Sequence, residues 1–305
     1  MVSLRARLII LRLRLQRRKR FYSSAVTMRR NLSSHQSRQR AQPPNWMRRR
    51  YRITESRIDD HACFTLSPGQ GIRSPIHIFH MHGGGFVESP EPHHWRFAAR
   101  LVDCLGCRYT LPMYPLAPEH DHSTIVPMVE NAYHRSVAGS SAAHRVVVGD
   151  SAGGTLALLL TRHLRERDME QPSGVVLLSP WIDLATDDPM SRVIDPVDPE
   201  LGVTGLRQAG RWFAGTRDLD DPEVSPAFGA LDGSAPVVVF VGDRDILLPD
   251  ARRIKRLGDA AGVEVDLYEY SGMFHNWIMQ PIPEGRRAID QLLTFIDIHQ
   301  RRTIS

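Results

Sequence analysis

Cysteine is scarce in this chain of 305 residues. The three that occur, Cys63, Cys104 and Cys107, are too few and uneven in number for a disulfide scaffold, and they favour a reducing compartment. Cys104 and Cys107 have the spacing of a redox or zinc motif, but no second pair accompanies them. We therefore interpret both as small apolar residues and predict a cytoplasmic protein.

Acidic residues are absent from the first 52 positions. These positions hold 16 of the 39 Lys and Arg residues and none of the 34 Asp and Glu, which leaves the remainder with a net charge of −11. The sequence pI of about 9.4 therefore reflects a basic N-terminal arm and not a basic body. We accordingly predict no nucleic-acid partner.

The arm also lacks a long apolar run. Its longest, residues 8–11, is too short for a signal peptide or a membrane-spanning helix. Leu4, Leu8, Leu11 and Leu15 recur at helical spacing, and three interpretations stay open. The arm is a solvated extension, an organelle-targeting presequence, or a surface helix attracted to anionic lipid. A start at Met28 would remove the first 27 residues from the protein altogether.

Strands and helices alternate along the rest of the chain. Residues 51–58 and 61–66 alternate apolar and polar side chains around Asp59-Asp60, which predicts an antiparallel hairpin. Further strands are predicted at residues 76–81, 107–114, 144–150, 174–180, 236–242 and 263–270, and helices at 92–105, 126–137, 151–167, 249–261 and 284–299. Continuous β-branched runs separated by helices indicate a mainly parallel sheet covered on both faces.

The alternation breaks between residues 181 and 230. This stretch is rich in Asp, Pro and Gly, and its helical pattern lies around residues 206–213. Because fifty residues without a strand are long for a connection, we predict an inserted lid. The predicted organisation is an arm with a portion of the cap at 1–49, core at 50–180, cap or lid at 181–230 and core again at 231–305. Residues 31–49 are predicted to be a loose linker.

A serine lies between a predicted strand and a predicted helix. In "RVVVGDSAGG", Gly149, Ser151 and Gly153 form a G-x-S-x-G pattern, which holds a serine on a strained turn with its hydroxyl exposed above the sheet. The helix N-terminus adds partial positive charge behind that serine. A tight turn with a solvent-facing serine is the alternative interpretation. The neighbouring Asp150 is expected to be structural.

A serine nucleophile needs a base, and the base needs an orienting acid. Sites of the G-x-S-x-G type have the chain order Ser, acid, His. Asp243 and Asp245 both follow a predicted strand, and His275 follows the next strand in "YSGMFHNW". Both aspartates qualify on this reasoning, and an ordinary loop histidine is the alternative for His275.

Three adjacent glycines follow a predicted strand in "HMHGGGF". Without side chains, the N–H groups of Gly83, Gly84 and Gly85 can converge on a developing oxyanion, together with the N–H of Ala152 after the serine. A phosphate loop is excluded because the Lys and Ser/Thr that it needs do not follow. The two histidines of this stretch lack a third metal ligand, and we predict neither a metal site nor a cofactor.

Together, these motifs resemble the hormone-sensitive-lipase-like branch of the α/β-hydrolases. The matching segments, in family order over roughly residues 50–300, are "HGGGF", "YPLAPEH", "GDSAGG", "SPWIDL", "VSPAFG", "VGDRDILLPDA" and "FHNW". The resemblance implies an α/β-hydrolase fold, with a mainly parallel sheet of the eight-stranded type flanked by helices, and a mostly helical cap. It makes Ser151 the nucleophile, His275 the base and Asp245, ahead of Asp243, the acid. His82 would shape the glycine loop.

The resemblance also implies an activity, which is hydrolysis of small to medium acyl esters through an acyl-enzyme. A small-molecule ester would be the partner. A lactonase or deacetylase of the same family is an alternative, and so is a non-catalytic small-ligand receptor on the same fold. The predicted pocket walls, for each of which plain core packing is the alternative, are Phe86, Trp181, Met190, Trp212 and Phe213.

Overall fold

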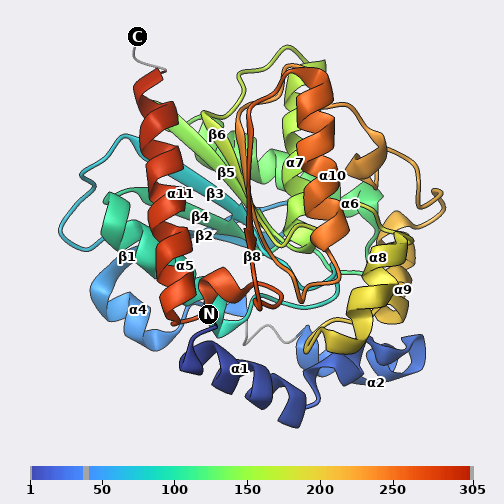
Figure 1. Cartoon of the computed structure of the whole chain (residues 1–305). Coiled ribbons are helices and arrows are strands. Elements are labelled where there is room, and N and C mark those ends of the chain that lie inside the picture. Colours follow the sequence, from blue (N-terminus) through green and yellow to red (C-terminus); the bar gives the residue numbers. More distant parts are fainter. Residues whose placement is uncertain (1, 37–40, 303–305) are drawn as a thin grey trace.

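An eight-stranded sheet forms the centre of the protein (Figure 1). The computed structural model describes residues 2–36 and 41–302. In the order in which they lie in the sheet, the strands are β1 (Tyr51–Ile58), β2 (His61–Pro68), β4 (Arg108–Pro112), β3 (Ile76–Met81), β5 (His144–Asp150), β6 (Gly174–Leu178), β7 (Val237–Gly242) and β8 (Val265–Tyr270). β2 pairs antiparallel with β1 and β4, and the other five pairs are parallel, which confirms the predicted sheet.

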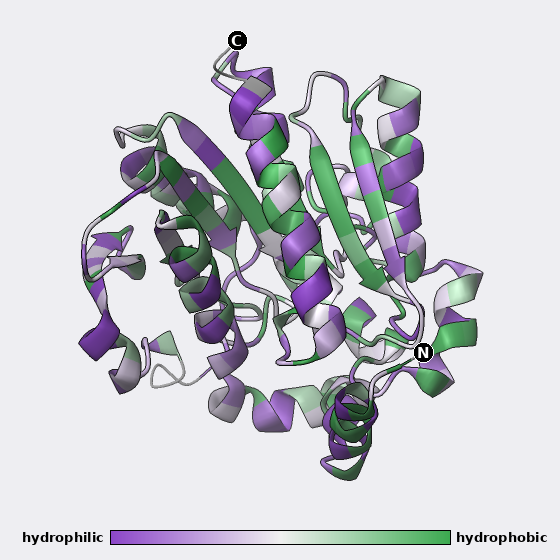
Figure 2. Ribbon diagram, turned by 60° about the vertical axis from the view of Figure 1, so that its left-hand side comes forward, coloured by the Kyte–Doolittle hydropathy of each residue, from purple (hydrophilic) through white to green (hydrophobic). Residues whose placement is uncertain are grey.

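Helices cover both faces of the sheet. One face carries α5 (Pro92–Leu105) and α11 (Pro283–Arg302), and the other carries α6 (His122–Tyr133), α7 (Ala152–Glu166) and α10 (Leu248–Ala261). Successive strand side chains point to opposite faces, so Val147 of β5 joins one core cluster while Val146 and Val148 join the other. Figure 2 shows mainly hydrophobic residues along the central strands and mixed character on the surrounding helices.

The helix predicted at residues 126–137 has different ends. α6 begins at His122, because the Asp121 carboxylate accepts the N–H of Ser123 and caps the first turn. It ends in a single π turn, His134–Ala138. The sequence pattern missed both features because it follows apolar periodicity, which the polar first turn does not show.

Residues 181–230 contain no strand, and the structure describes all of them. Their helical segments are α8 (Pro189–Ile194), η3 (Asp195–Val197), α9 (Val203–Ala214) and η4 (Pro226–Phe228). α9 contains the predicted helical pattern. The interpretation of this stretch as a lid stays a prediction.

The N-terminal arm is folded, so its interpretation as a solvated extension is wrong. It forms α1 (Leu4–Leu15), η1 (Arg18–Ser23), α2 (Ala25–His35) and α4 (Asn45–Arg50), and among its described residues the buried side chains include Ala6, Ile10, Phe21, Tyr22, Met28, Leu32 and Met47. η1 and α2 pack on α9, so closely that a Cβ added at Gly205 would lie 2.2 Å from the Tyr22 carbonyl oxygen. Arm and cap stretch thus lie together at one end of the molecule (Figure 1).

The predicted loose linker at residues 31–49 is also partly helical. It includes the end of α2 and most of α4, while residues 37–40 lie outside the described residues. Burial of Leu32 and Met47 gives these short helices the tertiary packing that their sequence alone does not signal. No helix in the described part of the chain has both the length and the apolar character needed to cross a bilayer.

Candidate active site

Ser151 lies on a strained turn between β5 and α7. Its backbone has φ 52° and ψ −121°, a conformation that non-glycine residues rarely adopt. The flanking glycines are required by space. A Cβ at Gly149 would lie 2.3 Å from the carbonyl oxygen of Gly153, and one at Gly153 would lie 1.9 Å from that of Met81 on β3. The G-x-S-x-G pattern therefore presses the start of α7 against two strands and places the serine above their ends.

A narrow cavity of about 40 Å³ lies beside this serine. Of the predicted site residues, it brings together Ser151, His275, Gly83 and Gly84. The cavity is also lined by Arg18 and Tyr22 of the arm, by Glu88, Ser89, Glu91, His93 and His94 after the glycine loop, and by Glu200, Leu201, Asn276 and Gln280. Residues from the arm, the core and the 181–230 stretch therefore meet at one place.

His275 forms a hydrogen-bonded pair with Asp245. Its Nδ1 donates to Oδ2 of Asp245 at 2.9 Å, and both side chains are buried. The Asp243 carboxylate accepts the N–H of Gly272 at 2.6 Å instead. Of the two aspartates that the strand-end position allowed, the geometry therefore favours Asp245 as the partner of His275.

Negative charge surrounds this histidine. Burial lowers the pKa of His275, but the charge and hydrogen bond of Asp245, helped by Glu200 and Asp198, outweigh it and raise the pKa to about 9. Asp198 is a site residue that the sequence analysis missed. Burial and the charge of Asp245 raise its own pKa to about 7, and it accepts the N–H of Ile246 at 3.0 Å. It thereby holds the loop that carries Asp245.

The glycine loop presents free backbone donors. The N–H of Gly83 already donates to Oδ1 of Asp150 at 3.0 Å. The N–H groups of Gly84, Gly85 and Ala152 have no hydrogen-bond acceptor among the described residues. Gly84 and Gly85 have φ of 112° and 59°, which only glycine adopts easily. These three N–H groups are therefore free to donate to a ligand oxygen, whereas that of Gly83 is engaged, and their role as oxyanion donors stays a prediction.

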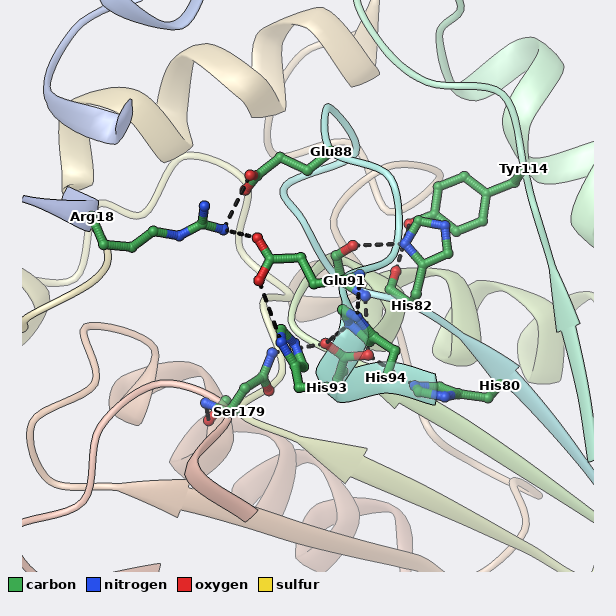
Figure 3. A network of polar contacts seen from close by, with 12 residues as sticks. Arg18, His80, His82, Glu88, Glu91, His93, His94, Tyr114 and Ser179 are labelled. Atoms are coloured by element: carbon green, nitrogen blue, oxygen red, sulfur yellow. Dashed lines mark hydrogen bonds and ion pairs between the residues drawn. The ribbon is translucent and has the colours of Figure 1, made fainter. Parts of the chain in front are cut away.

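A buried network ties the glycine loop to the rest of the site (Figure 3). Asp150 accepts hydrogen bonds from Nε2 of His80 at 2.8 Å, Nε2 of His94 at 3.3 Å, the N–H of Gly83, and Nδ2 of Asn276 at 2.7 Å. Burial raises the pKa of Asp150, but the two histidines outweigh it and hold the pKa well below its usual range. The expectation that Asp150 is structural agrees with these contacts.

His82 supports the loop from within. Its Nδ1 donates to the carbonyl oxygen of Gly83 at 2.7 Å, and its ring stacks on Tyr114 with centroids 4.3 Å apart. Burial lowers the pKa of His82 to about 3, so the ring is neutral. Within residues 2–36 and 41–302, no three His, Cys, Asp or Glu side chains are grouped as metal ligands.

Arg18 of the arm forms the charged wall of the cavity (Figure 3). Its Nη2 lies 3.1 Å from Glu88 and 2.7 Å from Glu91, and its Nε lies 3.7 Å from Glu200. Tyr22 donates its hydroxyl to Glu88 at 2.6 Å. The sequence analysis missed this wall, because nothing distinguishes Arg18 from the other arginines of the arm until the fold places it beside three carboxylates.

The five predicted pocket walls do not line this cavity. Phe86 stacks on Phe213 with centroids 3.8 Å apart and lies beside Trp181, and all three are buried in the core. Trp212 lies under the guanidinium of Arg29 at 5.3 Å. Met190 is 43% exposed on α8. These positions agree with the alternative of core packing for the three buried rings, and a role in substrate binding stays a prediction.

Known proteins are similar to this chain in sequence and in fold. Residues 78–279 match the model of a family described as the alpha/beta hydrolase fold. An esterase of Acinetobacter venetianus is 34% identical over 72% of this chain and 73% of its own, and an acetyl-hydrolase of Streptomyces hygroscopicus is 32% identical over 72% and 74%. The crystal structure of an esterase from the bacterial hormone-sensitive lipase family superposes with a TM-score of 0.81, at 25% identity over 99% of both chains.

Proposed function

The chain belongs to the hormone-sensitive-lipase-like branch of the α/β-hydrolases, and we propose that it hydrolyses carboxylic esters through an acyl-enzyme on Ser151. It is a carboxylesterase-type hydrolase, like its relatives named esterase and acetyl-hydrolase. The observation that carries the serine mechanism is the cavity that Ser151 and His275 both line, with His275 hydrogen-bonded to Asp245.

The mechanism follows from the roles that these groups can fill. Nε2 of neutral His275 takes the Ser151 proton as Oγ attacks the ester carbonyl, and Asp245 stabilises the imidazolium that forms. The carbonyl oxygen becomes an oxyanion and accepts the free N–H groups of Gly84, Gly85 and Ala152. The imidazolium then protonates the leaving alcohol. Water, deprotonated by His275, then attacks the acyl-enzyme, and the imidazolium returns that proton to Ser151 Oγ as the acid is released.

The size of the cavity favours a short acyl group. A volume of about 40 Å³ holds only a few water molecules, because each needs roughly 10–15 Å³ of such space. We propose acetyl esters as the first substrates to test. Acetate-ester deacetylation is the same reaction, and the acetyl-hydrolase relative supports it over lactone hydrolysis. The three cysteines are free, in keeping with the proposed cytoplasmic location.

The decisive experiment replaces the nucleophile. We expect Ser151→Ala to lower kcat for p-nitrophenyl acetate by at least about a thousandfold and to abolish labelling by a fluorophosphonate probe. Ser123→Ala, outside the cavity lining, is the matched control and should retain both. Circular dichroism verifies that each variant is folded. Retained turnover in Ser151→Ala would sink the assignment, and a wild-type chain that neither reacts nor labels would favour the receptor alternative.

A p-nitrophenyl ester series of increasing chain length tests the acyl preference. We expect kcat/KM to fall beyond the shortest chains, because the small cavity, lined mainly by charged and polar residues, leaves little room for a longer one. A lactone and an amide serve as controls for the type of bond. Highest activity on long acyl chains would contradict the short-acyl proposal without affecting the role of Ser151.

A further inference from the structure

Helix α1 has two apolar faces. One packs on the body, where Ala6 and Ile10 are buried and belong to the core cluster that contains α5 and α11. The other consists of four leucines that are each more than half exposed, namely Leu4 at 72%, Leu8 at 55%, Leu11 at 53% and Leu15 at 74%. Figure 1 shows α1 at the outer edge of the molecule, with its outward side uncovered. An ordered helix thus presents a continuous leucine stripe to its surroundings.

Arginines border this stripe on both sides. At about 100° per residue, the four leucines fall within an arc of about 60°. Arg5 and Arg12 then lie on one flank and Arg7 and Arg14 on the other. All four arginines are exposed, and none of them has an acidic partner within the described residues. The arrangement is an apolar ridge between two rows of unpaired positive charge.

We propose that α1 docks the protein on an anionic lipid surface. The leucines would enter the boundary between headgroups and acyl chains, and the arginines on both flanks would lie at the level of the lipid phosphates. An interfacial helix of this kind lies in the plane of the membrane and does not cross it. With 12 residues, α1 is about 18 Å long, well short of the roughly 30 Å hydrocarbon core.

Charge decides between lipid and a second copy of the chain. A symmetric pair of α1 stripes would bring the arginine rows of both copies together, and like charges in contact repel. The surface area that four leucines on a 12-residue helix can bury is also far below the roughly 800 Å² per partner that stable protein interfaces bury. An anionic surface satisfies both the apolar ridge and its charged borders at once.

The test measures binding of the intact chain to vesicles. We expect flotation with vesicles of phosphatidylcholine and phosphatidylglycerol, weak flotation with phosphatidylcholine alone, and loss of binding as salt rises. Leu8→Ser with Leu15→Ser should weaken binding by at least about twentyfold. Arg7→Gln with Arg12→Gln should weaken it on the order of twentyfold, since each arginine near an anionic surface contributes about fivefold.

Matched controls remove equivalent groups elsewhere. Val193→Ser takes away an apolar side chain that is 70% exposed on α8, and Arg256→Gln with Arg286→Gln removes the same charge from α10 and α11. These controls should bind as the wild type does. Thermal unfolding and turnover of p-nitrophenyl acetate should be unchanged in all variants, because none of the substituted residues lines the catalytic cavity.

Four outcomes would overturn the proposal. The first three are no vesicle binding by the wild type, equal loss in the controls and the α1 variants, and equal binding to neutral and anionic vesicles. A fourth is a dimer of the wild type in analytical ultracentrifugation that Leu8→Ser with Leu15→Ser dissociates, which would assign the stripe to a second copy. The readout does not use catalysis, so it stands apart from the outcome for Ser151.

Discussion

Removing the guanidinium of Arg18 tests whether the arm is fastened to the catalytic cavity. Arg18→Met keeps much of the side-chain length but deletes the contacts with Glu88 at 3.1 Å and Glu91 at 2.7 Å. Glu88, only 4% exposed, would keep Tyr22 and His35 as hydrogen-bond partners but would lose the positive charge of Arg18 beside it. Burial raises the pKa of Glu88, and Arg18 and His35 hold it below its usual range.

The magnitude follows from distance and exposure. At an effective dielectric constant of about 20, opposite charges about 3 Å apart attract by about 5 kcal/mol before solvation is counted. Arg18 is 22% exposed, and desolvation offsets much of this attraction, so we expect a net loss of about 2 kcal/mol. For a chain of this size, that loss lowers Tm by about 4 °C.

A double-mutant cycle isolates the pair. Thermal unfolding of Arg18→Met, Glu88→Gln and the double variant should give a coupling energy of at least about 1 kcal/mol. Arg301→Met is the matched control, because its pair with Asp297 is exposed and contributes at most about 0.5 kcal/mol. The reasoning fails if Arg18→Met costs no more than this control, or if the two cavity substitutions are simply additive.

Two further predictions concern the serine turn and its base. His275 must be neutral to accept the Ser151 proton, and its pKa is raised to about 9. We therefore expect kcat/KM to rise about tenfold from pH 7 to pH 8, against about 1.3-fold for an ordinary histidine. Initial rates on p-nitrophenyl acetate measure this rise, and an acid limb of the pH profile centred near pH 6.5 would contradict the raised pKa. Gly153→Ala should lower the free energy of unfolding by about 3 kcal/mol or more, because its Cβ would lie 1.9 Å from the Met81 carbonyl oxygen. Gly139→Ala, whose nearest neighbour would be 3.6 Å away, should change it little in urea unfolding, and equal losses would refute the steric argument.

The regular part of the fold could be predicted because each element carries its own signal. β3, β5 and α5 have the predicted bounds, since a buried strand is a continuous apolar run and α5 shows strong helical periodicity. Most of the arm carried no such signal: the leucine spacing indicated a helix at α1, but nothing marked η1, α2 or α4. The arm helices are short and rich in arginine, and burial of side chains such as Tyr22 and Met28 in the core stabilises them. Tertiary packing of this kind has no periodic trace in a sequence.

The residues of the candidate site also fall into two groups, those with a local sequence signal and those placed only by tertiary packing. Ser151, His275 and the glycine loop could be proposed because each lies in a local motif whose geometry is fixed by neighbouring residues. Gly83 could not be separated from Gly84 by sequence, since only the fold shows that Asp150 occupies its N–H. Glu200 could not be found at all. It enters the cavity from the 181–230 stretch, and its position depends on how that stretch folds over the core.

The basic residues of the arm do not all play the same part, because the fold places them in different surroundings. Arg18 and Lys19 meet carboxylates of the body and of the 181–230 stretch, and those contacts help to hold η1 beside the cavity. The four arginines of α1 face outward on either side of the leucine stripe, where no carboxylate of the described chain reaches them. If the charge of the arm served only to hold it on the body, these four arginines would add electrostatic repulsion and no stabilising contact. Their placement along an exposed apolar ridge is what connects them to a partner outside the chain.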